Sequence, residues 1–155
     1  MELQPKLIDV RVPKQPTGVV LVLHGGAARR ESAMVSPTQL SVLRMIPIAR
    51  RLAHAGRGRL AVFRLLNSRR GWDAHHTPVH DARWALEEIA GRLGHRLPTA
   101  LVGHSLGGRA ALLTAGAPEV TTAVALAPYV YPTDVAPGAE RRSLLIVHGD
   151  RDRIA

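Results

Sequence analysis

The 155 residues, 46% of them hydrophobic, are enough to bury a core, and they predict a single domain over residues 1–155 rather than a disordered chain. The absence of cysteine excludes disulfides, thiolate metal sites and a cysteine nucleophile. The formal charge of +9 comes almost entirely from arginines spread along the chain, and with aromatic residues at only 3% we expect no nucleic-acid partner.

The first half of the chain alternates predicted strands and helices. Residues 6–12 alternate weakly between apolar and polar and predict an edge strand, whereas residues 19–23 are a continuous apolar run, as in a strand buried on both faces. A helical pattern follows from Leu40. Pro47 interrupts it, and because proline is tolerated only in a first turn, we expect the helix to begin again there and to end near Gly56.

The second half continues the alternation. The predicted strands are residues 60–66, 99–102, 121–127 and 144–147, and the predicted helices are residues 78–93 and 106–117. Strands that alternate with helices in this way predict an α/β fold, a three-layer sandwich around a mostly parallel, doubly wound sheet. The connection over residues 128–142, only about fifteen residues, is too short for a separate cap domain.

The most informative segment is Gly103-His104-Ser105-Leu106-Gly107, which lies between a predicted strand and a helix of small residues. A serine on such a tight turn needs small residues two positions before and after it, so this segment is a nucleophile elbow candidate. The helix that starts near Leu106 would leave unpaired N–H groups beside the serine oxygen, where they would stabilise developing negative charge.

Two further segments follow predicted strands and contain residue types that are common in catalytic sites. His24-Gly25-Gly26 ends the strand of residues 19–23, and His148-Gly149-Asp150-Arg151-Asp152 ends the strand of residues 144–147. In open α/β sheets the carboxyl ends of the strands hold the ligand site, so we expect these segments to lie near Ser105. The order of glycines, serine and then acid is the order used by α/β-hydrolases.

On these three segments the sequence resembles the α/β-hydrolase superfamily, in particular its compact branch with little or no lid, the dienelactone-hydrolase-like proteins and small esterases. The resemblance runs from about Val19 onward. It implies Ser105 as nucleophile, Asp152 as the acid, and the backbone N–H groups of Gly26 and Leu106 as the oxyanion hole. It further implies a small-molecule acyl substrate, cleavage through an acyl-enzyme, no cofactor and no metal.

The chain departs from that family in one respect: the general-base histidine, which follows the acid in the family, has no counterpart in the three residues after Asp152. We therefore expect an incomplete hydrolase that lacks its C-terminal strand and helix, is nearly inert without its base, and exposes residues 144–147 as an aggregation-prone edge. By the same resemblance His24 is structural, and His104 is expected to point sideways. A histidine that is present could stand in for the base: His148 lies near the sheet edge, and His75, His76 and His80 could reach the site only if their loop folds over it. His54 and His95 lie at predicted helix ends, where a histidine suits the last carbonyl groups.

Other classes of protein fit less well. A catalytically silent binding or scaffold protein with the same fold is the main alternative, because the histidine is missing. No phosphate-binding glycine motif follows a predicted strand, which argues against nucleotide binding. The sequence does not favour a metal site, because His76 and His80 would share a helix face only if a helix ran across Pro78.

Two other residues have structural interpretations. Trp72 could line a pocket or pack under its loop, and Asp81 falls in the first turn of a predicted helix, where a carboxylate interacts well with the helix dipole.

The compartment and the assembly are less constrained. The N-terminus has no apolar signal-like run and no stretch approaches the ~18 apolar residues of a membrane span, so we expect a cytoplasmic protein with no membrane partner. The sequence leaves the oligomeric state open.

Overall fold

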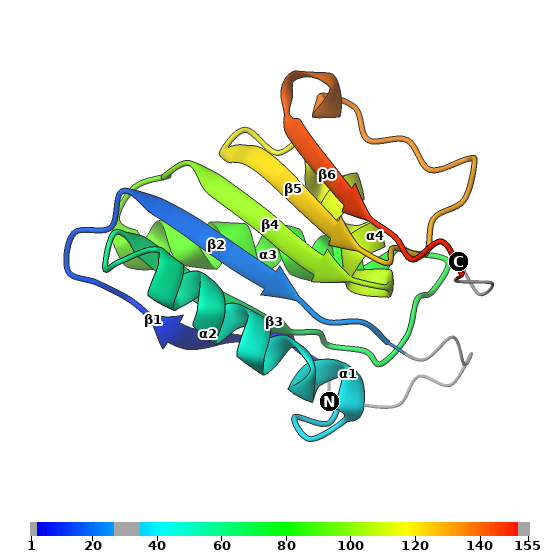
Figure 1. Cartoon of the computed structure of the whole chain (residues 1–155), viewed down its shortest axis with the longest axis horizontal. Coiled ribbons are helices and arrows are strands. Elements are labelled where there is room, and N and C mark those ends of the chain that lie inside the picture. Colours follow the sequence, from blue (N-terminus) through cyan, green and yellow to red (C-terminus); the bar gives the residue numbers. More distant parts are fainter. Residues whose placement is uncertain (1–2, 27–34, 152–155) are drawn as a thin grey trace.

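A computed structural model describes residues 3–26 and 35–151 of the chain (Figure 1). Its described strands form one six-stranded sheet in the order β1-β3-β2-β4-β5-β6. In chain order they are β1 (Lys6–Arg11), β2 (Gly18–Leu23), β3 (Leu60–Leu66), β4 (Thr99–His104), β5 (Val120–Leu126) and β6 (Ser143–Val147). The α-helices are α1 (Leu40–Leu43), α2 (Met45–Ala55), α3 (Thr77–Leu93) and α4 (Leu106–Thr114).

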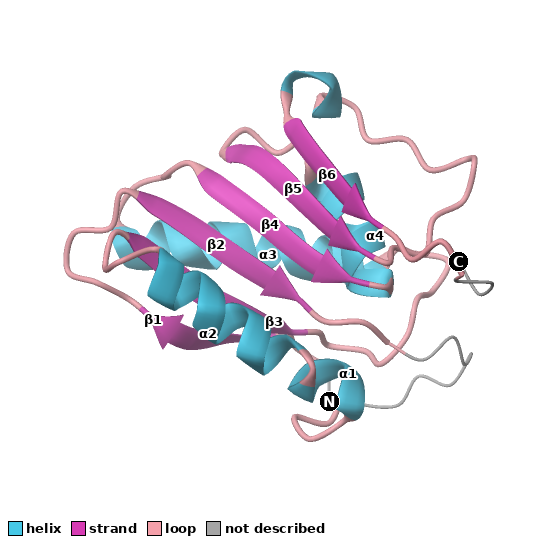
Figure 2. Ribbon diagram, in the orientation of Figure 1, coloured by secondary structure: helices cyan, strands magenta, loops and turns pink. Residues whose placement is uncertain are grey.

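The sheet is parallel except at one edge. β1 pairs antiparallel with β3, and every other pair of neighbouring strands is parallel, with helices in the crossovers (Figure 2). Helices α1 and α2 cover one face and α3 and α4 cover the other (Figure 1). The predicted three-layer α/β architecture with a mostly parallel sheet is therefore confirmed.

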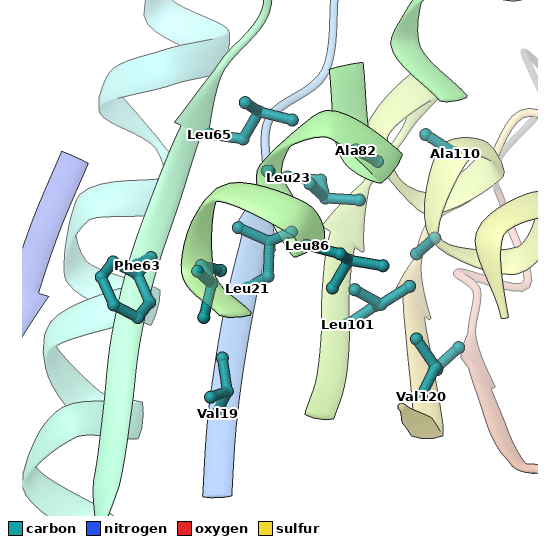
Figure 3. Close-up of a cluster of buried hydrophobic side chains, with 14 of the residues drawn as sticks. Val19, Leu21, Leu23, Phe63, Leu65, Ala82, Leu86, Leu101, Ala110 and Val120 are labelled. Atoms are coloured by element: carbon teal, nitrogen blue, oxygen red, sulfur yellow. The ribbon is translucent and has the colours of Figure 1, made fainter. Parts of the chain in front are cut away.

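The core lies on both sides of β2, all six of whose residues are buried. Because side chains alternate between the faces of a strand, Val19, Leu21 and Leu23 pack under α3 and α4 (Figure 3). Val20 and Val22 pack under α2 on the other face. A strand covered on both faces needs apolar side chains at every position, which explains the unbroken run in the sequence.

The helix boundaries differ slightly from the predicted ones. The break near Pro47 is confirmed, because α1 ends before Met45 and Pro47 lies in the first turn of α2. Helix α3 begins at Thr77 and runs across Pro78, which the sequence analysis placed at the helix start. Asp81 therefore lies beyond the first turn, and the expected interaction with the helix dipole is wrong; its carboxylate instead accepts hydrogen bonds from Ser68.

The connection between β5 and β6 forms no separate cap. It leaves the carboxyl end of β5, returns to the amino end of β6, and contains one turn of 3-10 helix, Ala139–Arg141, just before that strand (Figure 2). Arg142 donates to the carbonyl oxygens of Ala115 and Ala117, at distances of 3.3 and 3.4 Å, and so ties the end of this connection to the C-terminal end of α4.

Strand β6 is the edge of the sheet in the described part of the chain, and no helix of that part covers either of its faces. Its four aliphatic side chains are 48 to 55% exposed; they are Leu144, Leu145, Ile146 and Val147. Successive residues of a strand point to opposite faces, so apolar groups meet water on both sides.

Among the described residues, no helix is long and apolar enough to cross a membrane.

We expect this exposed edge to make the 155-residue chain self-associate. Replacing Leu145 and Ile146 together with lysine should keep the chain monomeric to a higher concentration, measured by light scattering, because charge on both faces opposes edge pairing. Leu40→Lys, at a residue 78% exposed on α1, is the matched control and should leave association unchanged. Equal association of the double variant and the unmodified chain would contradict the expectation.

Candidate active site

Ser105 lies at the carboxyl edge of the sheet, on the turn from β4 into α4, and it is partly exposed. Its backbone has φ 55° and ψ −119°, a conformation that residues with a Cβ rarely adopt. Such strain persists only where the surrounding structure enforces it, and it is concentrated at functional sites.

The strain is enforced by glycines that allow backbones to touch. A Cβ on Gly103 would overlap the backbone of Gly107 and Gly108, so the chain folds back on itself around the serine. A Cβ on Gly107 would lie 2.5 Å from the carbonyl oxygen of His24, which means that the start of α4 rests directly on the end of β2. The need for glycine at both positions, expected from the motif, follows from these contacts.

Hydrogen bonds hold the serine backbone from both sides. The N–H of Ser105 donates to the carbonyl oxygen of Leu126 at 2.9 Å. The carbonyl oxygen of Ser105 accepts from the N–H of Arg109 at 3.1 Å and from that of Tyr129 at 3.3 Å. The elbow is thus joined to the end of β5 as well as to its own helix.

The glycines after β2 lie beside this turn. A Cβ on Gly25 would come within 3.3 Å of the Cβ of Ser105, and a Cβ on Gly26 would overlap the carbonyl oxygen of Arg70. Leu106 is the first residue of α4, so its N–H has no partner within the helix. The structure therefore brings together Ser105, Leu106 and the Gly25-Gly26 segment, whereas Asp152 lies outside the described residues.

His24 is locked by its neighbours. Its ring is buried; Nε2 accepts the N–H of Asn67 at 3.1 Å, so Nδ1 carries the proton and donates to the carbonyl oxygen of Gly25 at 2.5 Å. Burial lowers the pKa of His24, and the nearby Arg64 lowers it further. With both ring nitrogens engaged, His24 shapes the glycine loop and leaves no nitrogen for the serine.

His104 lies beside Ser105 with its Nδ1 buried and unpartnered within the described residues. Burial lowers the pKa of His104, and the charge of Arg44 adds to that effect. In the described structure Ser105 is thus paired neither with His24, whose two ring nitrogens have other partners, nor with Nδ1 of His104.

Sequence reasoning missed a cluster around Arg109, one turn after Ser105 on α4. The Arg109 side chain is buried, and its guanidinium pairs with both carboxylate oxygens of Asp134 at 2.8 and 2.7 Å. It lies 4.0 Å from the centre of the Trp72 ring and 4.8 Å from that of Tyr131. The hydrogen bonds from Arg109 lower the pKa of Asp134. The only signal in the sequence was the spacing of four residues from Ser105.

The loop that carries Trp72 is braced at both ends. Ser68 donates from its N–H at 2.8 Å and from its hydroxyl to the buried carboxylate of Asp81. Asp73 accepts from the N–H of Thr77 at 2.9 Å and from its hydroxyl at 2.5 Å. These bonds fix the loop to α3, so Trp72 has a defined position at the edge of the site.

No group of three candidate metal ligands comes together among residues 3–26 and 35–151. His76 and His80 do lie one turn apart at the start of α3, because the helix crosses Pro78, which the sequence argument did not foresee. The His76 ring packs edge-on against Trp72, with ring centres 5.4 Å apart.

Comparison with known proteins relates this architecture to serine hydrolases. No protein-family model and no curated protein matches the sequence. Among solved structures, an α/β serine hydrolase homologue from Coxiella burnetii is 19% identical with a TM-score of 0.70, over 97% of this chain and 70% of that one. A lid-less α/β serine hydrolase from Xanthomonas campestris is 18% identical with a TM-score of 0.64, over 97% and 66%.

A more distant match is the hyperthermophilic esterase of the archaeon Pyrobaculum calidifontis, 20% identical with a TM-score of 0.54 over 82% of this chain and 44% of that one. These likenesses show the fold. The chain has the α/β-hydrolase fold, as the sequence motifs indicated. Its β5–β6 connection, all of which is described, forms no cap, and the chain spans 66 to 70% of the length of the first two structures.

We expect Gly107→Ala to destabilise the protein by about 1–3 kcal/mol or more, because the new methyl group would press on the carbonyl oxygens of Leu23 and His24. The matched control is Gly91→Ala on the exposed face of α3, where a Cβ meets nothing within 4 Å. That change should stabilise the protein by about 0.5–1 kcal/mol, since glycine is a poor helix former. Urea unfolding measures both, and a loss of stability at Gly91 or none at Gly107 would contradict the packing argument.

The lowered pKa of His24 gives stability a pH dependence. Because the unfolded chain takes up this proton near pH 6.5 and the folded chain only at lower pH, the free energy of unfolding should fall as the pH drops below about 6.5. The slope is at most about 1.4 kcal/mol per pH unit for each proton. His24→Gln removes the group and should reduce the slope between pH 7 and 5, leaving the part that comes from His104, whose pKa is also lowered. An unchanged slope would contradict the contribution of His24.

Proposed function

We propose that the protein is a serine hydrolase that cleaves a carboxylic ester or a related acyl bond of a small-molecule substrate through an acyl-enzyme, in the cytoplasm and without a cofactor. One observation carries the proposal: Ser105 is strained and partly exposed on a turn whose glycines admit no side chain. The fold shared with known serine hydrolases supports it, since the same turn in that fold presents a nucleophile.

In the proposed reaction Ser105 Oγ attacks the acyl carbonyl carbon and loses its proton to a base. The carbonyl oxygen becomes an alkoxide, which the N–H groups of Leu106 and Gly26 would bind, because both segments lie against Ser105. The N-terminal end of α4 adds its dipole at the same point. The leaving group departs with a proton from the base, and water then hydrolyses the acyl-enzyme in the same way.

The base is the part of the proposal that rests outside the 155 residues. His24 is engaged at both ring nitrogens, and Asp152 would orient a histidine that follows it in a longer protein. Loss of the base from such a triad costs on the order of a millionfold in turnover. The 155 residues alone are therefore proposed to be nearly inert.

A fluorophosphonate probe tests the proposal, because it labels a serine only when that serine is activated. We expect the full-length product of the gene to be labelled at Ser105 and to hydrolyse p-nitrophenyl acetate, with both signals lost in Ser105→Ala. The 155-residue chain should react at least about a thousandfold more slowly.

The outcomes separate the alternatives. A folded full-length product that is never labelled would identify a silent member of this fold, a binding or scaffold protein, and would overturn the proposal. Equal labelling of the 155-residue chain would mean that one of the eight histidines present acts as the base. Mass spectrometry of the labelled peptide checks that Ser105 is the modified residue.

A further inference from the structure

The Arg109 side chain contacts a carboxylate and two aromatic rings at once. The residue is only 7% exposed. Its guanidinium pairs with Asp134 through two hydrogen bonds and lies against the faces of Trp72 and Tyr131. A planar cation in contact with two ring faces, with a carboxylate at its edge, satisfies the charge and the donors of arginine at once. The proposed chemistry of Ser105 uses none of these groups directly.

Each partner of Arg109 belongs to a segment that also touches the site. Trp72 follows Arg70 and Gly71, whose backbone rests on Gly26. Tyr131 lies on the segment whose Tyr129 N–H donates to the carbonyl oxygen of Ser105. Arg109 itself donates its N–H to that same oxygen. The guanidinium therefore joins the segment that packs on Gly26 to the segment after β5, and the backbone of the same residue holds the turn of Ser105.

The two partner segments also have their own support. Asp134 accepts the N–H of Tyr131 at 2.9 Å, and the rings of Tyr129 and Tyr131 pack edge-on with centres 5.4 Å apart. The Trp72 loop is fixed to α3 through Asp81 and Asp73. Each segment is thus ordered by contacts of its own, and the Arg109 side chain touches both.

We propose that Arg109 is a positioning residue of the hydrolase: by binding Trp72, Tyr131 and Asp134 together, it holds Ser105 and the N–H of Gly26 at the separation that attack on an acyl carbon requires. This inference rests on the proposed function. The reacting atoms must be aligned to within about 1 Å, since a misplacement of that size costs about a hundredfold in rate.

The interaction demands arginine. A lysine in this position keeps the positive charge but has no planar group to lie against two ring faces and no fork for two carboxylate oxygens. Arg109→Lys should therefore loosen the three segments without leaving Asp134 free of a cation. The same substitution at Arg142 is the matched control, because Arg142 also holds a segment against α4, at the end away from Ser105.

The experiment measures fluorophosphonate labelling of the full-length product of the gene, with the maximal labelling rate separated from the affinity for the probe. We expect Arg109→Lys to lower the maximal rate by about tenfold to a hundredfold, and Arg142→Lys to leave it within about twofold of the unmodified rate. Urea unfolding of both variants shows whether the rate simply follows stability, which a purely structural role would require.

Trp72 gives a second readout that needs no activity. The 155-residue chain has two tryptophans, so when this chain carries Trp84→Phe all of its tryptophan emission comes from Trp72. Arg109→Lys should raise the quenching of this emission by acrylamide at least about twofold, because the ring loses its covering guanidinium, and Arg142→Lys should leave it unchanged.

If Arg109→Lys fails to fold, the paired variant Arg109→Met with Asp134→Leu removes both charges together and is expected to fold. It should show the same loss of labelling rate. Labelling of either folded variant at the unmodified rate overturns the inference and leaves the proposed function standing. Absence of labelling in the unmodified full-length protein overturns the proposed function, and the inference with it.

Discussion

The site depends on the direct contact of backbones at the start of α4. Gly107 lies against the carbonyl oxygens of Leu23 and His24, and Gly103 lies against Gly107, so no side chain separates the end of β2 from the turn that carries Ser105. This contact forces the serine into its unusual backbone conformation and brings the Gly25-Gly26 loop alongside it. The sheet supplies the rigidity, since β2 is buried along its whole length.

Much of this arrangement could be predicted from the sequence, because its signals are local. The unbroken apolar run of residues 19–23 indicates a strand covered on both faces, and the glycines two residues either side of Ser105 indicate a turn with no room for side chains. Parallel strands then place all their following loops at one edge. Even the restart of the helix near Pro47 follows from the chemistry of proline alone.

The walls of the site could not be predicted, because they depend on pairs far apart in the chain. Arg109 contacts Trp72 and Asp134 only in the folded chain. The sequence around each of these three residues gives no signal that predicts the contact. Asp81 illustrates the same limit: its position near a helix start indicated a dipole interaction, whereas its carboxylate serves Ser68 on the preceding loop.

The shared guanidinium of Arg109 also restricts how the molecule can diversify. In this fold, recognition surfaces change by lengthening or shortening loops while the sheet stays constant. Here the loop that carries Trp72 and the segment that carries Asp134 both contact the guanidinium of Arg109. A change in the length of either segment alone would therefore disturb the contact that the other makes with Arg109. New specificities in this lineage would have to arise through coordinated changes in both segments, or through the loss of Arg109 itself.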